Sequence, residues 1–237
     1  MNRMNWSMMI LALLALASCH KGVFDSGPLI TEERVLNDEY HNVTIESSMD
    51  VVVMDGATYD LLIEGGENKL PFIETKVVDG TLVLREKRNH IRNDKQVRIF
   101  ISETYLNNIT IDGSGDFTGD ALTAGDLNIN IEGSGDVDIS AEVSSTIDVD
   151  INGSGDVKID GNAEAVSIQI DGSGDVDTRL VNAQDAYVFV DGSGDVRLTA
   201  TEMLHIEIDG SGDVYYWGNP ASVELDIDGS GDVFDME

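Results

Sequence analysis

Apolar and polar residues alternate along short segments in the C-terminal half of the chain. Branched apolar residues occupy every second position, and mostly polar residues such as Thr110, Asn130 and Gln169 lie between them. A period of two predicts strands with one buried face, and no stretch after the N-terminal apolar run shows a helical period. The apolar positions nearest to the following turn are Ile111, Ile131, Ile151, Ile170, Val190, Ile208 and Ile227.

The turns after these strands repeat one tetrapeptide. Gly-Ser-Gly-Asp occurs seven times, at intervals of 18 to 20 residues. One coil of this length buries too few side chains to fold alone, whereas stacked coils place each apolar residue on its equivalent in the next coil. The repeats start at Gly113, Gly133, Gly153, Gly172, Gly192, Gly210 and Gly229.

The repeat predicts an all-β fold, a parallel β-helix with about seven regular coils over residues 108–237, and we expect a right-handed coil. The competing architecture is a meander of antiparallel hairpins. It would need a second turn of equal quality in each period, and the second connection is irregular, as at Gly119-Asp120 and Gly161-Asn162. Residues 35–107 keep the strand pattern without the tetrapeptide, so we expect a less regular β region that opens the solenoid and covers its first edge.

The N-terminus has the pattern of an export signal. Residues 6–17 are apolar apart from one serine, a run too short to span a bilayer but typical of a signal-peptide core. The run ends in Leu-Ala-Ser-Cys19, which resembles the lipobox of bacterial lipoproteins. That resemblance implies that residues 1–18 are removed, that Cys19 carries a lipid anchor to the membrane, and that residues 19–34 form a tether. We expect a lipoprotein of the cell envelope at the outer membrane, on a face that the sequence does not define.

Several segments resemble one bacterial family. They are Ile45–Val53, Tyr59–Glu64, Asp79–Leu84 and Val97–Ile101, followed by Ile-x-Ile-Asp-Gly-Ser-Gly-Asp repeats from Ile109 onward. In this order they are similar to the putative auto-transporter adhesins with a head GIN domain. The likeness covers nearly all of residues 35–237. It implies a β-helical lipoprotein or secreted surface protein of Gram-negative bacteria, and it supplies no catalytic residue.

The net charge of −31 narrows the range of partners. A field of this sign repels nucleic-acid phosphates and anionic headgroups, so we expect no nucleic-acid partner, whereas cations and basic partners are attracted. The chain has one cysteine, which excludes an intramolecular disulfide. The core, or bound ions, must therefore hold the fold together.

Two files of acidic residues flank the predicted corners, and they make Ca²⁺ the cofactor to consider. Facing files could supply oxygen ligands for a hard cation. Alternatively, each aspartate caps its own turn by accepting backbone N–H groups. The file after the corner is Asp116, Asp136, Asp156, Asp175, Asp195, Asp213 and Asp232; the file before it holds Asp171, Asp191, Asp209 and Asp228, with Asp112, Glu132 and Asn152 in the first coils.

Tyr215, Tyr216 and Trp217 form the one dense aromatic cluster, near the last coil. Two roles are open for it. The rings could cap the C-terminal end of the core, or they could form a patch that contacts a glycan or a protein partner, since exposed aromatic residues mark interfaces.

The sequence favours a protein without catalytic activity. The serine of the corner recurs in all seven repeats and the four histidines are scattered, so turn geometry explains the serines better than a nucleophile elbow does. The prediction is a non-enzymatic envelope lipoprotein, an adhesin or surface binding module that presents a rigid acidic β-helix. One alternative is a polysaccharide-active β-helix enzyme of the lyase type, which needs a lysine or arginine base; Arg179 and Arg197 lie on successive coils, but the repeat face is otherwise poor in bases. The other alternative is a purely structural envelope protein.

Overall fold

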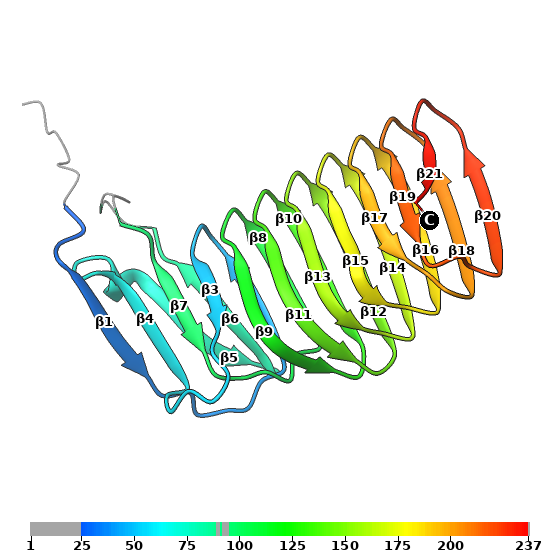
Figure 1. The fold of residues 1–237 in the computed structure, drawn as a ribbon. Helices are drawn as coiled ribbons and strands as arrows, with labels where there is room; N and C mark the ends of the chain where they lie inside the picture. The colour runs from blue at the N-terminus through cyan, green and yellow to red at the C-terminus, as the bar shows by residue number, and fades with distance from the viewer. Residues whose placement is uncertain (1–24, 89–90, 92–94, 237) are drawn as a thin grey trace, which may run out of the picture.

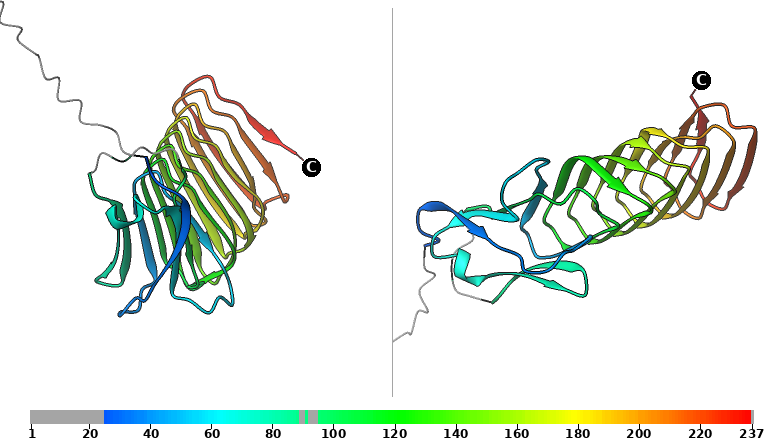
Figure 2. Two further views of the ribbon diagram at one scale, coloured as in Figure 1. Left: turned by 90° about the vertical axis from the view of Figure 1, so that its left-hand side faces the viewer. Right: turned by 90° about the horizontal axis from the view of Figure 1, so that it is seen from below.

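The computed structural model describes residues 25–88, 91 and 95–236, in which the regular elements are strands and one short 3-10 helix (Figure 1). The strands form two sheets, one of eleven and one of ten, that enclose the core between them (Figure 2). The predicted all-β solenoid is therefore confirmed.

Seven strand pairs make up the regular part. In each pair the chain passes along the ten-stranded sheet, turns at Gly-Ser-Gly-Asp, and returns along the eleven-stranded sheet. Pairing between successive coils is parallel and joins equivalent residues, such as Ile131 with Ile151 and Val137 with Val157. The pairs are β8 (Asn108–Gly113) with β9 (Phe117–Ala124), β10 (Leu127–Gly133) with β11 (Val137–Val143), β12 (Thr146–Gly153) with β13 (Val157–Asn162), β14 (Ala165–Gly172) with β15 (Val176–Asn182), β16 (Asp185–Gly192) with β17 (Val196–Thr199), β18 (Met203–Ile208) with β19 (Val214–Trp217), and β20 (Ser222–Ile227) with β21 (Val233–Asp235).

Close stacking of the coils explains why every corner in this chain repeats the same residues. The inward side chains of Ile131 and Ile151 are fully buried, and each contributes about 2 kcal/mol of hydrophobic stabilisation. At the corner the backbones themselves touch: a Cβ atom on Gly155 would lie 2.1 Å from the carbonyl oxygen of Gly135. Only glycine fits at such a distance, so the repeat keeps it.

The N-terminal region continues both sheets before it departs from the solenoid. β2 (Asn42–Glu46) pairs in parallel with β8 and with β6 (Thr81–Glu86). β3 (Asp50–Val53) pairs in parallel with β9 and with β7 (Arg98–Ile101). These four strands extend both sheets beyond the regular coils by parallel pairing.

The outermost strands of the N-terminal region pair antiparallel instead of parallel. β1 (Leu29–Arg34), β4 (Leu61–Gly66) and β5 (Ile73–Val78) pair antiparallel with their neighbours, and the 3-10 helix η1 (Leu70–Phe72) leads into β5. The reason for β5 is local, because Asp79 and Gly80 both have positive φ, 49° and 75°, as in the tight turn of a hairpin. The less regular part of the N-terminal region is therefore built from hairpin-like pairing and not from coils.

Candidate functional site

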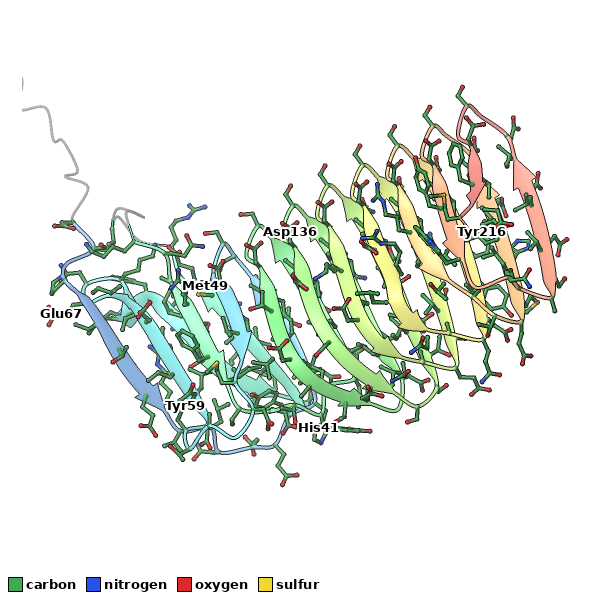
Figure 3. All side chains as sticks on the ribbon, viewed as in Figure 1. His41, Met49, Tyr59, Glu67, Asp136 and Tyr216 are labelled. Atoms are coloured by element: carbon green, nitrogen blue, oxygen red, sulfur yellow. The ribbon has the colours of Figure 1, made fainter. Side chains whose placement is uncertain are left out.

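The aspartates after the corners form a ladder along one edge of the solenoid. Oδ1 of each accepts a hydrogen bond from the backbone N–H of the equivalent aspartate in the next coil, over 2.8 to 3.0 Å. Asp136, labelled in Figure 3, accepts in this way from Asp156 at 2.8 Å. The members are Asp116, Asp136, Asp156, Asp175, Asp195 and Asp213 as acceptors, with the N–H of Asp232 as the last donor. The expectation that each aspartate caps its own turn is wrong, because the N–H group belongs to the following coil.

The second file, acidic except for one asparagine, is exposed at every corner. Its members are Asp112, Glu132, Asn152, Asp171, Asp191, Asp209 and Asp228. Within the described ranges, no three His, Cys, Asp or Glu side chains are placed to hold one metal ion. The two files thus form no carboxylate cluster around a common point, and the Ca²⁺ hypothesis gains no support from the geometry.

The aromatic cluster lies on β19, where alternate side chains point to opposite faces. Tyr216, labelled in Figure 3, packs against the core, whereas Tyr215 and Trp217 lie on the outer face of the eleven-stranded sheet. β20 and β21 follow in one more coil. The cluster is therefore not a cap over the C-terminal end, although Tyr216 contributes to the core.

Tyr215 belongs to a row of outward side chains that runs along the solenoid. The strand register aligns Arg197, Tyr215 and Phe234. The rings of Tyr215 and Phe234 stack with centroids 4.9 Å apart and planes 13° apart, and Arg197 Cζ lies 5.4 Å from the Tyr215 centroid on a neighbouring coil. The Tyr215 hydroxyl donates to Asp213 Oδ2 at 3.3 Å, and its pKa is raised first by desolvation and then by the charge of Asp213.

Trp217 borders an apolar depression of about 430 Å³ with Arg179, Leu180 and Thr199. Arg179 Cζ lies 5.7 Å from the Trp217 ring centroid. The same guanidinium is fixed by Asp177, through Nε at 2.9 Å and Nη2 at 2.6 Å, and this hydrogen-bonded pair raises the pKa of Arg179.

Leu180 reaches this depression because of a bulge. The register between β13 and β15 shifts after Lys158, so one extra residue of β15 is accommodated, and Arg179 and Leu180 both face outward. Leu180 is 65% exposed as a result. We call the combined set the aromatic–arginine surface: Arg179, Leu180, Arg197, Tyr215, Trp217 and Phe234.

Sequence reasoning found part of this surface. It singled out Tyr215, Trp217 and, separately, the two arginines, but it missed Phe234 and Leu180. Phe234 had a signal, because Arg197, Tyr215 and Phe234 all come two residues after a repeat aspartate. For Leu180 the signal is the coil from Gly172 to Gly192, which is 20 residues long after a 19-residue coil.

The fold and this surface define a class: a parallel β-solenoid with long open faces. The chain belongs to the family described as putative auto-transporter adhesin, head GIN domain, which it matches over residues 39–220. The resemblance drawn from the sequence is therefore confirmed. A search of curated proteins finds no match.

Solved structures share the fold. A putative adhesin from Bacteroides fragilis is 28% identical with a TM-score of 0.82, over 89% of this chain and 98% of that chain. A putative adhesin from Parabacteroides distasonis is 20% identical with a TM-score of 0.67, over 89% and 98%. A protein from the same species described as a putative lipid binding protein is 23% identical with a TM-score of 0.66, over 90% and 99%.

The predicted lipidation site is not part of this description. Cys19 and the signal segment lie outside the described residues. Between residues 25 and 236, leaving out 89–90 and 92–94, no helix has the length and apolar character needed to cross a membrane.

Proposed function

We propose that this protein is a non-enzymatic binding module of the cell envelope, of the adhesin type, and that its aromatic–arginine surface binds a neutral polysaccharide. The observation that carries the proposal is the gathering of rings and guanidinium groups on neighbouring coils of one sheet face. This gathering occurs in a chain whose net charge is −31. The family, described as putative adhesins, is consistent with it.

The solenoid suits an extended ligand. Neighbouring coils lie about 4.8 Å apart in the hydrogen-bonding direction. Side chains at one position of the repeat therefore form regular rows along the axis, as Arg197, Tyr215 and Phe234 do. A chain of like units can lie along such a row and make the same contact more than once.

The chemistry of the surface fits carbohydrate better than a charged polymer. Leu180 and Trp217 offer apolar area to the C–H groups of a sugar ring, and Asp177 with Arg179 offers acceptors and donors to its hydroxyls. The flat faces of Tyr215 are already occupied by Arg197 and Phe234, so the sugar meets the Trp217 side of the surface. The negative field of the whole protein disfavours anionic glycans.

Arg179 is better suited to binding than to catalysis. A lyase base has to release its proton at working pH. The bidentate contact with Asp177 raises the pKa of Arg179 and works against that role. The proposal therefore favours the binding module over the polysaccharide-active enzyme, with the polysaccharide as a ligand and not a substrate.

The anchor is part of the proposal. The lipobox-like Leu-Ala-Ser-Cys19 supports acylation of Cys19, and acyl chains hold the module at the outer membrane with the solenoid on the cell surface. Metabolic labelling with a radioactive fatty acid should mark the wild type and not Cys19→Ala. Protease added to intact cells should degrade the protein; protection until the outer membrane is opened would place it in the periplasm instead.

The binding proposal is tested on a panel of immobilised neutral and acidic polysaccharides. We expect the purified soluble protein to bind neutral members, and Trp217→Ala and Leu180→Ser to weaken that binding at least tenfold. The matched control is Phe189→Ala, which removes an exposed aromatic ring from the other sheet and should leave binding unchanged. Equal loss in all three variants, or binding to a protein-coated surface only, would contradict a glycan site here.

A further inference from the structure

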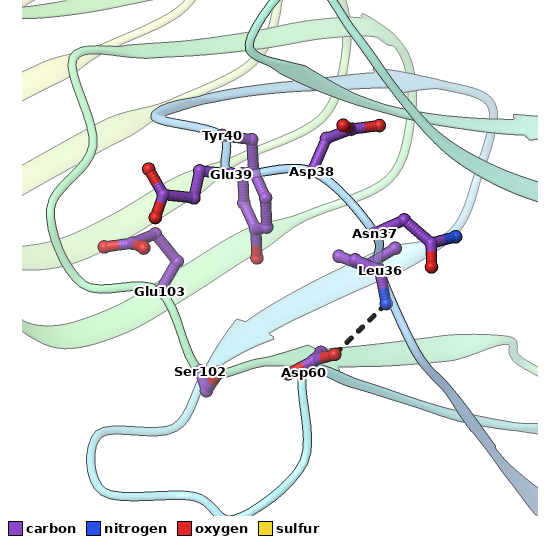
Figure 4. A pocket seen from close by; sticks show the side chains of 8 residues that line it. All are labelled: Leu36, Asn37, Asp38, Glu39, Tyr40, Asp60, Ser102 and Glu103. Atoms are coloured by element: carbon purple, nitrogen blue, oxygen red, sulfur yellow. Dashed lines mark hydrogen bonds between the residues drawn. The ribbon is translucent and has the colours of Figure 1, made fainter.

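A second site lies far along the fold from the aromatic–arginine surface, in the N-terminal region. The chain between β1 and β2 crosses the edge where β4 begins and β7 ends, and the register of these two strands places Leu61 opposite Ile101. The residues just outside that pair, Asp60 and Ser102, therefore face the crossing segment. Together they form a pocket of about 240 Å³, lined by Leu36, Asn37, Asp38, Glu39, Tyr40, Asp60, Ser102 and Glu103 (Figure 4).

Four carboxylate side chains line this pocket, and no lysine, arginine or histidine is among the lining residues. Asp38, Glu39, Asp60 and Glu103 line it, and none of them forms an ion pair with another described residue. Their recorded partners are backbone groups: Asp60 Oδ2 accepts from Leu36 N–H at 3.1 Å, and Glu103 Oε1 accepts from the N–H of Tyr105 at 2.8 Å. Acidic clusters are common on this chain, so the charge alone identifies no ligand.

Tyr40 supplies the independent observation. Its side chain is only 6% exposed, and its hydroxyl is the single buried side-chain polar atom in the described residues that has no hydrogen-bond partner. In Figure 4 that hydroxyl points into the ring of side chains that line the pocket. Burial, and then the charges of Glu103 and Asp60, raise the pKa of Tyr40, so the phenol stays neutral. An unpartnered buried hydroxyl costs about 1 to 3 kcal/mol.

The lining selects the kind of ligand. Its groups are mainly hydrogen-bond acceptors, and the phenol oxygen adds one more. No three of the carboxylates described here are arranged to hold one metal ion. The volume equals that of about eight water molecules at about 30 Å³ each, which is room for several heavy atoms. A group with several N–H donors and a positive charge can donate both to the phenol oxygen and to the carboxylates.

We propose that this pocket binds a primary ammonium group carried on an alkyl chain. The ammonium lies between Asp60 and Glu103 and donates to the Tyr40 hydroxyl, while Leu36 contacts the alkyl part. The group can come from a free amine or from a lysine side chain of a partner. This site is separate from the polysaccharide surface, and its test does not depend on that proposal.

Calorimetric titration of the soluble protein tests the site with two probes, 1,5-diaminopentane and Nα-acetyl-lysine methylamide, at constant ionic strength. We expect saturable 1:1 binding of at least one probe, and the tighter probe identifies the source of the ammonium. The uncharged 1,5-pentanediol should not bind. Preference for the diol, or displacement of the amine by Ca²⁺ at equal ionic strength, would overturn the proposal.

Variants separate the site from general charge attraction. Asp60→Asn combined with Glu103→Gln keeps the backbone hydrogen bonds and should weaken amine binding at least tenfold. Tyr40→Phe keeps the buried ring and should weaken it roughly threefold to tenfold. The matched control, Asp148→Asn with Asp150→Asn on the outer side of β12, removes the same charge elsewhere and should change affinity less than twofold. An equal loss in the control would show that only net charge attracts the amine.

Discussion

The two ends of the solenoid differ in how the core is closed. At the N-terminal end, antiparallel strands and η1 cover it, and Leu61, Ile63 and Leu70 are fully buried. At the C-terminal end, β20 and β21 are the outer strands of their sheets. There Leu225 is 48% exposed and Ile227 is 42% exposed, although their partners in the preceding coil, Ile206 and Ile208, are completely buried.

The difference shows that position in the repeat does not by itself bury a side chain. Ile208 and Ile227 occupy the same place in their coils, and only Ile208 has a coil on both sides. Burial in a solenoid is a property of neighbours, so each coil is stabilised by the two that flank it. At the N-terminal end antiparallel strands replace a further coil, whereas at the C-terminal end one side of the last coil has no neighbouring coil.

The largest expected contrast in stability is between truncating an isoleucine in the middle of the solenoid and truncating the equivalent isoleucine at the open end. Ile151→Ala removes a fully buried side chain between Ile131 and Ile170 and should lower the free energy of unfolding by about 4 kcal/mol. Ile227→Ala, at the same repeat position, should cost about 1 kcal/mol or less, because the side chain is already half in water. Urea denaturation measures both, and equal losses would mean that the last coil is covered in solution.

A methyl group at the corner gives the second largest contrast. A Cβ atom would meet the carbonyl oxygen of the preceding coil at 2.1 Å in both Gly155→Ala and Gly231→Ala. Gly155 has coils on both sides, so the overlap should cost about 3 kcal/mol. The last coil can move away, so Gly231→Ala should leave the urea midpoint nearly unchanged and speed amide exchange only in residues 222–236. Protection of those amides equal to the wild type would contradict an independent last coil.

The regular part of the fold was predictable because a nearly constant repeat length allows only one register between successive coils that keeps the apolar residues inside. Moving a coil by one residue would turn Ile131 and its equivalents outward, so the seven repeats fix both the strand pairing and the core. The same periodicity placed Tyr215 and Trp217 on one strand, but their role needed the neighbouring coils. These residues would cap the core only if no coil followed them, and the parallel pairing of β21 with β19 shows that one more coil follows.

The rest depended on contacts that no local pattern encodes. Apolar segments such as Leu61–Ile63 fit a parallel or an antiparallel neighbour equally well, so the reversal of β4 was not visible in the sequence. The repeat aspartates were recognised as hydrogen-bond acceptors, but the N–H group they accept from lies about twenty residues away in sequence. Tyr40 had no signal at all, because its unpartnered hydroxyl results from the crossing of a loop over two strand ends.

The aspartate ladder gives a smaller contrast between middle and end. Asp156→Ala removes the acceptor for the N–H of Asp175 and should lower stability by about 1 kcal/mol. Asp156→Asn keeps an acceptor oxygen and removes a charge from a crowded file, so it should match or exceed the wild type. Asp232 has no following coil to bond, and Asp232→Ala should change nothing measurable. A loss at Asp232 equal to that at Asp156 would show that the carboxylate acts within its own turn.

Calcium should have the smallest effect of all. An ion held between the two acidic files would need oxygen ligands from adjacent coils, so it would stabilise the middle coils and leave the open end unchanged. In the geometry described, the first file is engaged with backbone N–H groups and no three carboxylates converge. We therefore expect the same thermal midpoint in Ca²⁺ and in chelator when ionic strength is matched. A higher midpoint in Ca²⁺ that is lost in Asp156→Asn and kept in Asp232→Asn would restore the calcium hypothesis, and it would locate the ion between coils that have neighbours on both sides.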